Sequence, residues 1–170
     1  MTDMELYKYL RSYCKKVAAE GRPFEDSFSA FQNEMVRQSI DYAEKRAEKI
    51  YIYSDLEDGA FQALSLFRID GKYYTRNDID REIREGKRTS SLSEQDRRDI
   101  RMTVLCYAVS VRELCRDYGK PIPTVIKLVY DAKKRRVDAK YGYERLRSLS
   151  DTEPEVRCRM WFDEIRENNL

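Results

Sequence analysis

Much of the chemistry that proteins perform at catalytic sites depends on histidine, and this chain of 170 residues contains none. Histidine is the commonest general base, the usual partner of a serine or cysteine nucleophile, and the commonest zinc ligand. Its absence excludes a catalytic triad and a zinc site that includes histidine.

Two further reaction classes lack the residues that they need. The six glycines are too sparse for a phosphate-cradling loop, and no Gly-Lys-Ser or Gly-Lys-Thr string occurs, which excludes nucleotide hydrolysis by a P-loop. Paired carboxylates can act as acid and base without histidine, but no spacing among the 31 acidic residues selects such a pair. We therefore expect a protein that binds a partner, is not an enzyme and needs no cofactor.

The four cysteines are spread along the chain without a Cys-x-x-Cys pair, and three of them fall within apolar helical stripes. They are Cys14, Cys106, Cys115 and Cys158. This setting favours buried free thiols over disulfides or a metal cage, so we expect no bound metal.

An acidic cluster, Asp55, Glu57 and Asp58, precedes Gly59 and superficially suggests a calcium-binding loop. An EF-hand needs oxygen ligands at alternate positions and a glutamate six residues after the glycine, where this chain has Ser65. The cluster instead predicts the tip of a β-hairpin, which would offer an acidic contact to a basic partner protein.

The most obvious basic run extends from Lys133 to Arg136. With the nearby Tyr130, Tyr141 and Tyr143 it could combine phosphate contacts with base stacking. The other interpretation is a solvated hairpin turn, since turns are polar and charges at a sheet edge resist aggregation. We favour the solvated turn.

Tyrosine is frequent in the segments that alternate like strands. Strand aromatics usually form cross-strand packing pairs and sometimes form a recognition surface. Only the outward-facing half is available to a partner, because successive side chains point to opposite faces of a sheet. The predicted partner-binding residues are Asp55, Glu57, Asp58, Tyr51, Tyr53, Tyr73, Tyr74, Tyr141 and Tyr143.

The elements that position these residues begin with a pair of helices in residues 1–47. Apolar residues from Leu6 to Val17 share one helical face before Gly21-Arg22-Pro23 breaks the pattern. From Phe24 to Met35, apolar residues then recur at three- and four-residue steps, which predicts a second helix.

The period changes to two after residue 48. Strand patterns at Ile50–Tyr53 and Ala60–Ile69 are separated by Asp58-Gly59, which suits a tight hairpin. A second turn at Asp70-Gly71 leads into Tyr73-Tyr74, so this section predicts a three-stranded antiparallel meander.

The second half returns to helices, interrupted by one hairpin. A short helix and a loop are expected in residues 77–93, and Ser93 begins a long amphipathic helix that Gly119 and Pro121 end. A hairpin follows in residues 125–143, and the capping-box spacing of residues 152–155 opens a last helix. The apolar residues of that helix are Val156, Met160, Trp161 and Ile165.

These patterns predict one α+β domain over residues 1–170, a mainly antiparallel sheet of about five strands with helices packed on it. Residues 1–47 supply an N-terminal helical pair, and residues 48–170 supply the sheet, long helix, hairpin and C-terminal helix. The chain has no run of about 20 apolar residues and no signal-peptide core, so we expect a cytoplasmic protein without a membrane partner. The 33 basic and 31 acidic residues give no global field that would select nucleic acid, and the oligomeric state stays open.

Three segments together resemble a known family. EKIYIYSDLEDGAFQALSLFRIDGKYYTRNDID, Glu48 to Asp80, contains a strand, an acidic turn, a strand and an aromatic strand. A helix end, a proline-containing link and a hairpin follow in RELCRDYGKPIPTVIKLVYDAKKRRVDAKYGYERL, Arg112 to Leu146, and WFDEI occupies Trp161 to Ile165. In this order they resemble the YezG-like immunity (antitoxin) proteins of bacterial polymorphic toxin systems.

The resemblance implies a cytosolic protein that binds and neutralises a co-encoded secreted toxin, in some members a nuclease, and has no catalytic residues. The partner would then be a cognate toxin protein, contacted by the acidic tip and the outward-facing tyrosines. The alternative function is a nucleic-acid-binding or regulatory module that uses the basic turn and strand tyrosines. An enzyme without histidine is a third, weaker interpretation.

The apolar setting of the cysteines generates a first prediction. Thiol titration of the unfolded, unreduced protein should find four free thiols, because their spacing matches core residues and not metal ligands. Stoichiometric zinc in the purified protein would contradict this interpretation.

Overall fold

The computed structural model describes residues 1–57, 61–145 and 153–170. Within them the helices are α1 (Asp3–Ala19), α2 (Phe24–Tyr42), α3 (Arg76–Arg84), α4 (Glu94–Asp117) and α6 (Pro154–Glu167). The strands are β1 (Lys49–Asp55), β2 (Gln62–Ile69), β3 (Lys72–Thr75), β4 (Val125–Asp131) and β5 (Arg136–Gly142).

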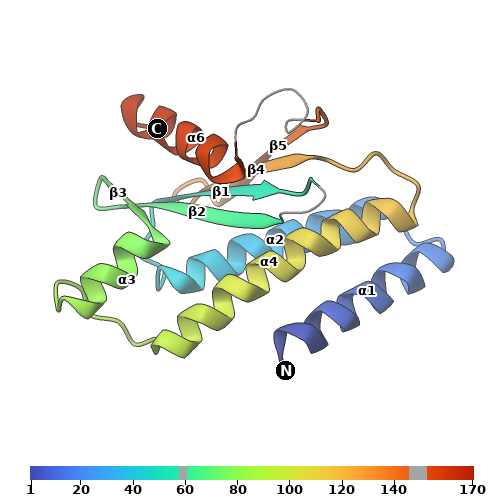
Figure 1. Ribbon diagram of the computed structural model, residues 1–170, viewed down its shortest axis with the longest axis horizontal. Helices are drawn as coiled ribbons and strands as arrows, with labels where there is room; N and C mark the ends of the chain where they lie inside the picture. Colours follow the sequence, from blue (N-terminus) through green and yellow to red (C-terminus); the bar gives the residue numbers. More distant parts are fainter. Residues whose placement is uncertain (58–60, 146–152) are drawn as a thin grey trace.

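The five strands form one antiparallel sheet in the order β3-β2-β1-β4-β5, with helices on both faces. In Figure 1, α2 and α4 lie beneath the sheet, α1 lies below them, and α6 lies above the sheet. The predicted α+β class, the antiparallel sheet of five strands and the N-terminal helical pair are confirmed.

Local sequence signals account for several element ends. Thr2, Thr75 and Ser93 each close a capping box at the start of α1, α3 and α4, which satisfies backbone donors that the first helical turn leaves unpaired. The β2–β3 turn, Asp70-Gly71, has positive φ at both residues, as a type I′ hairpin requires. The predicted Asp58-Gly59 turn lies outside the described residues.

The central strand β1 pairs along its length with β2 on one side and β4 on the other. Because alternate side chains point to opposite faces, Ile50 and Ile52 join the core beneath the sheet, whereas Tyr51 and Tyr53 join a second core above it. Both faces of β1 are therefore buried.

Helix α6 begins differently from the prediction. Its N-cap is Glu153, which makes no capping hydrogen bond through its side chain, and Thr152 lies outside the described residues. Pro154 at the first helical position restricts the residue before it to an extended conformation, and Glu153 has φ −66° and ψ 152°.

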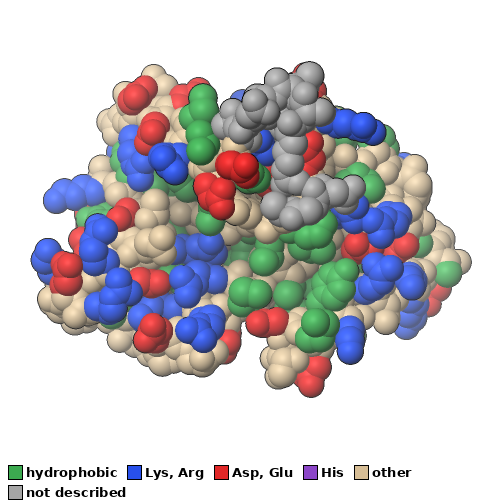
Figure 2. Space-filling view, in the orientation of Figure 1, with side chains coloured by type: hydrophobic (Ala, Val, Ile, Leu, Met, Phe, Trp, Pro, Cys, Tyr) green, Lys and Arg blue, Asp and Glu red, His purple; other side chains and the backbone are tan. Residues whose placement is uncertain are grey.

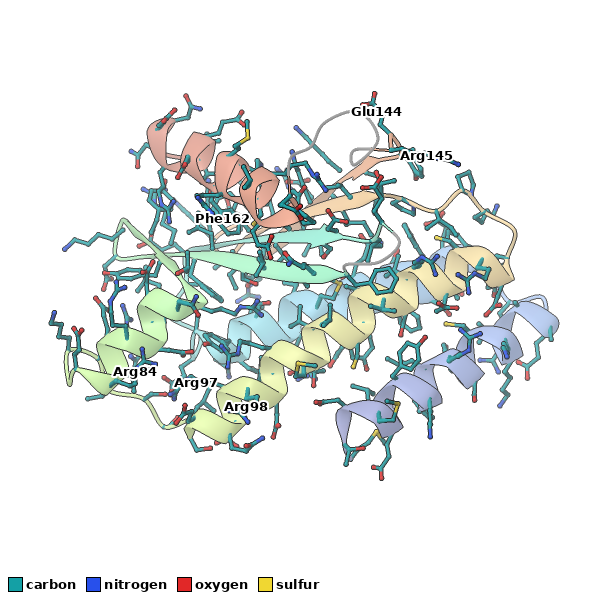
Figure 3. All side chains as sticks on the ribbon, in the orientation of Figure 1. Arg84, Arg97, Arg98, Glu144, Arg145 and Phe162 are labelled. Carbon is teal, nitrogen blue, oxygen red and sulfur yellow. The ribbon has the colours of Figure 1, made fainter. Side chains whose placement is uncertain are left out.

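The buried face of α6 also differs from the predicted stripe. Cys158, Phe162 and Ile165 are buried against the sheet, whereas Val156 and Met160 are exposed. Figure 3 shows Phe162 directed from α6 toward the sheet. The predicted Trp161 and Ile165 do contribute, since Trp161 packs against the core above the sheet.

None of the helices in the described part of the chain is long and apolar enough to cross a membrane.

The two sides of α6 provide a matched stability test. Replacing Phe162, which is 5% exposed, with alanine should lower the free energy of unfolding by about 3 kcal/mol, because it leaves a cavity under the helix. Met160 is 64% exposed, so Met160→Ala should change the free energy of unfolding by no more than about 0.5 kcal/mol. Urea denaturation measures both, and equal losses would contradict the docking of α6 on the sheet.

Candidate functional site

Two of the predicted partner-binding tyrosines are covered by α6. Tyr51 and Tyr53 are each 3% exposed, and the indole of Trp161 lies with its centroid 6.0 Å and 6.1 Å from their rings. Burial raises the pKa of Tyr51 to about 12 and also raises the pKa of Tyr53. Tyr51 and Tyr53 were predicted to bind a partner, but they pack inside the protein because α6 covers the face of the sheet to which they point.

The prediction that Asp55 forms part of an exposed acidic tip is wrong, because Asp55 is fully buried. Its Oδ2 atom lies 2.7 Å from Nη2 of Arg157 on α6, and Oε2 of the half-buried Glu57 lies 3.9 Å from the same nitrogen. Asp58 lies outside the described residues. Asp55 therefore contacts a cation of its own chain instead of a partner's, because α6 brings Arg157 onto the end of β1.

Local pattern gives no signal for this ion pair. Arg157 precedes the buried Cys158 on α6, and nothing in the sequence distinguishes it from the neighbouring Arg159. The pairing depends on how α6 crosses the sheet, which apolar periodicity does not specify.

The tyrosines of β3 are half-buried and already contact other parts of the chain. The hydroxyl of Tyr73 donates to the backbone oxygen of Leu170 at 2.6 Å, which ties β3 to the end of the chain. The guanidinium of Arg88 lies 4.7 Å from the ring centroid of Tyr74. Both residues keep some exposed surface, but their contacts are explained by the fold.

Tyr141 and Tyr143, at the end of β5, are the most accessible of the predicted tyrosines, with 37% and 53% exposure. Tyr141 is held in place, since its hydroxyl donates to Oε1 of Gln32 at 2.8 Å and its ring lies 5.4 Å from that of Phe28. A depression of about 330 Å³ adjoins both rings. Its apolar lining includes Phe24, Phe28, Pro121 and Pro123.

Among the strands that the structure describes, β5 pairs only with β4 and forms an edge of the sheet. Most of its residues are exposed, and Figure 3 shows Glu144 and Arg145 extending beyond it. On the α6 side, a second hollow of about 340 Å³ is lined partly by Lys127, Lys140 and Arg157. We name β5, Tyr141, Tyr143 and the two hollows the β5 surface.

The basic turn lies at the opposite end of β5. Lys133, Lys134, Arg135 and Arg136 are exposed, and the backbone N–H of Lys134 donates to Oδ1 of Asp131 at 3.1 Å. This geometry fits a solvated hairpin turn. Arg136 of the turn and Tyr141 lie five residues apart along β5, roughly 17 Å.

The described part of the chain contains no group of three or more His, Cys, Asp or Glu side chains placed to hold a metal ion. All four cysteines are buried free thiols, and burial raises the pKa of Cys14 and Cys158 to about 12. These thiols are protonated at physiological pH and belong to the core.

No family model matches the chain, and a search of curated proteins finds no significant match.

The buried ion pair under α6 generates a stability prediction. Asp55→Asn should lower the free energy of unfolding by about 3 kcal/mol, because it removes the closest carboxylate from the mostly buried guanidinium of Arg157. The matched control is Asp138→Asn, which breaks an exposed pair with Arg136 and should cost at most about 1 kcal/mol. Similar losses in the two variants would show that the buried pair does not hold α6.

Proposed function

We propose that this protein is an immunity protein, which binds a cognate bacterial toxin in the cytoplasm and blocks it by direct contact. It acts stoichiometrically, without catalysis or a cofactor. The segments that carry the resemblance to the YezG-like family correspond to β1 to β3, the end of α4 with the β4–β5 hairpin, and part of α6.

The observation that carries this proposal is the open edge of β5 beside two exposed tyrosines. An edge strand presents unpaired N–H and C=O groups, to which a partner can add a strand through backbone hydrogen bonds. The depression next to Tyr141 and Tyr143 would accept an apolar side chain of that partner. Tyrosine suits such a contact because it combines a large apolar ring with a hydrogen-bonding hydroxyl.

Charge indicates the kind of partner surface. Asp55 is withdrawn into an internal ion pair, whereas Lys133, Lys134 and Lys140 on the β4–β5 hairpin are exposed. A partner with an acidic rim would therefore be steered toward β5. This reverses the expectation of a basic partner that followed from the predicted acidic tip.

The required affinity is high, because a lethal enzyme must be almost wholly occupied. Nanomolar dissociation corresponds to about −12 kcal/mol, which demands a sizeable interface with a few well-packed anchors. Tyr141 and Tyr143 are the proposed anchors.

The alternative, a nucleic-acid-binding module, is less well supported by the geometry. As predicted, it would combine the basic turn with stacking aromatics, whereas the turn and the exposed tyrosines occupy opposite ends of β5. Binding of a protein at the β5 edge does not require the basic turn and the exposed tyrosines to be adjacent.

The test is to co-express the protein with the toxin encoded by the neighbouring gene, and to measure its affinity for an inactive variant of that toxin. Native protein should rescue growth and bind at nanomolar concentration. Tyr143→Ala should weaken binding by about 2 kcal/mol, roughly 30-fold, if Tyr143 is an anchor. Tyr9→Ala is the control, since Tyr9 is a comparably exposed tyrosine (58%) on α1.

The proposal fails if the native protein neither rescues growth nor binds the toxin. If the native protein rescues growth but Tyr143→Ala and Tyr9→Ala bind the toxin equally well, only the assignment of the β5 surface as the binding site is wrong. Salt-dependent binding of the native protein to DNA or RNA, lost when Lys133 and Lys134 are changed to glutamine, would support the nucleic-acid module instead.

A further inference from the structure

A cavity of about 500 Å³ opens at the other edge of the sheet, where β2 is only half covered. The four-residue strand β3 pairs with Leu66 to Ile69, and the chain then leaves the sheet at Thr75 to form α3. The first half of β2 has no neighbouring strand on that side among the described residues. The cavity lies there, between α6, α4 and the beginning of α3.

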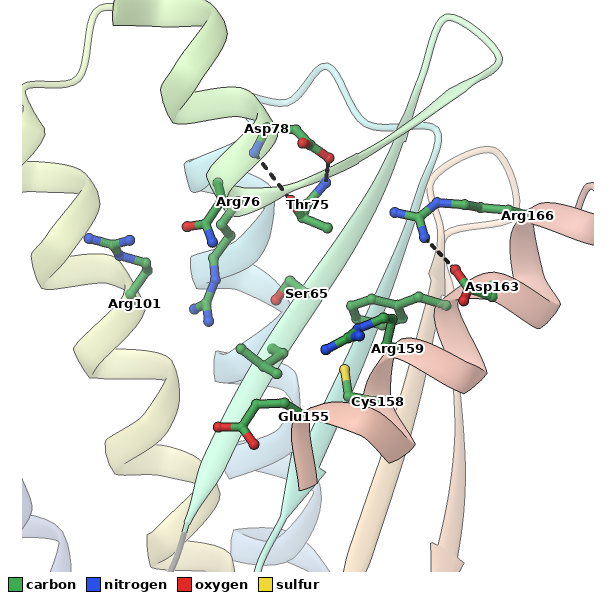
Figure 4. A pocket seen from close by; sticks show the side chains of 13 residues that line it. Ser65, Thr75, Arg76, Asp78, Arg101, Glu155, Cys158, Arg159, Asp163 and Arg166 are labelled. Carbon is green, nitrogen blue, oxygen red and sulfur yellow. Dashed lines mark hydrogen bonds and ion pairs between the residues drawn. The ribbon is translucent and has the colours of Figure 1, made fainter. Parts of the chain in front are cut away.

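Arginines from three elements line this cavity. Arg76 comes from α3, Arg101 from α4, and Arg159 and Arg166 from α6. Figure 4 shows the guanidinium groups of Arg76 and Arg159 extending toward the same space from opposite sides, with Ser65 of β2 between them. In Figure 2, Lys and Arg side chains also gather over α3 and the beginning of α4.

The acidic side chains at the cavity are largely engaged. Oδ1 of Asp163 lies 2.9 Å from Nη1 of Arg166, and Oδ1 of Asp78 lies 2.9 Å from Nη2 of Arg81. Oε1 of Glu155 accepts from the Gln62 amide at 2.7 Å.

Beneath the cavity, the buried Asp80 is shared by three partners. Its Oδ1 accepts from the hydroxyl of Tyr42 at 2.6 Å and from Nε of Arg97 at 2.9 Å, while its Oδ2 lies 3.6 Å from Nη1 of Arg101. The negative charge of Asp80 therefore compensates the positive charge of Arg101 only in part.

Arg76 and Arg159 form no ion pair with any carboxylate that the structure describes. Nη2 of Arg76 donates to the backbone oxygen of Ala63 at 2.7 Å, which caps the open edge of β2 and leaves other donors of the guanidinium for a ligand. Removal from water lowers the pKa of Arg76 to about 10, because the nearby Asp80 offsets only part of the cost of burying this cation.

The charges in and directly against the cavity do not balance. The described residues that line it include four guanidinium groups and three carboxylates: Arg76, Arg101, Arg159 and Arg166 against Asp78, Glu155 and Asp163. The thiol of Cys158 adds no negative charge, because burial raises its pKa to about 12. The lining therefore carries one more positive than negative charge, which favours an anionic ligand.

We propose that this cavity binds a phosphate-type anion, presented as inorganic phosphate or as a small phosphate monoester. Arg76 and Arg159 hold its oxygens from opposite sides, and planar guanidinium groups suit phosphate because two N–H donors can meet two oxygens. The N-terminus of α3 adds little by itself, since Thr75 and Asp78 already occupy its cap.

The apolar residues that line the cavity favour a phosphate monoester over inorganic phosphate. Leu64 and Phe162 give the cavity an apolar wall beside the arginines, and 500 Å³ is larger than one phosphate needs. An organic substituent on the phosphate would cover this wall. The site lies across the sheet from β5 and is independent of toxin binding.

Isothermal titration of the purified full-length protein with inorganic phosphate and with phenyl phosphate tests the proposal. Saturable one-to-one binding is expected, and tighter binding of phenyl phosphate would identify a monoester, whereas equal affinity would identify free phosphate. Arg159→Gln and Arg76→Gln should each weaken binding by about tenfold or more, the value of one charge-assisted contact.

Arg135→Gln is the matched control, because it removes the same charge at the exposed turn, and its affinity should stay within about twofold of native. Arg159 is exposed, so its variant keeps the test valid if loss of the Arg76 bond to Ala63 prevents folding. Absence of saturable binding at millimolar phosphate would overturn the proposal. Unchanged affinity in Arg159→Gln, or equal weakening in the Arg135 control, would also overturn it.

Discussion

The ion pair between Asp55 and Arg157 is the interaction on which the upper half of the molecule depends. Two charges taken out of water must be well paired, and here the Asp55 side chain is fully buried at the end of β1. The pair sets where α6 lies on the sheet, because Arg157 must reach that one carboxylate. The position of α6 in turn covers Tyr51 and Tyr53 and supplies one wall of the arginine-lined cavity.

The surfaces of the sheet that can bind a ligand lie at its two edges. Its central strand β1 is buried on both faces and paired on both sides, so it has no surface to offer. At one edge, β3 is too short to cover β2, and arginines collect at the gap. At the other, β5 exposes backbone and aromatic groups. The two surfaces can therefore take different ligands without competing.

Periodicity and turn residues predicted the elements well, because these signals are local. Ser93 capping α4 and the Asp70-Gly71 turn are examples in which a few neighbouring residues specify the backbone. The predictions that failed are tertiary. From the sequence alone, an acidic residue at a strand end is expected to be exposed. Asp55 is buried because α6, about a hundred residues later, brings Arg157 against it, and the spacing of Asp55 to Asp58 does not indicate this pairing. The exposed Tyr141 and Tyr143 were correctly placed at a strand end, but only the strand order shows that this strand is an edge.

The central claim, that a toxin adds to the β5 edge, is tested most directly by amide hydrogen exchange of the free protein and of its complex with an inactive toxin. Binding should slow exchange in β5, with the largest changes at amides whose N–H groups point away from β4. Exchange in α1, which lies on the far side of the sheet from α6 in Figure 1, should not change. Protection of α1 or α6 with unchanged exchange in β5 would contradict binding at the β5 edge.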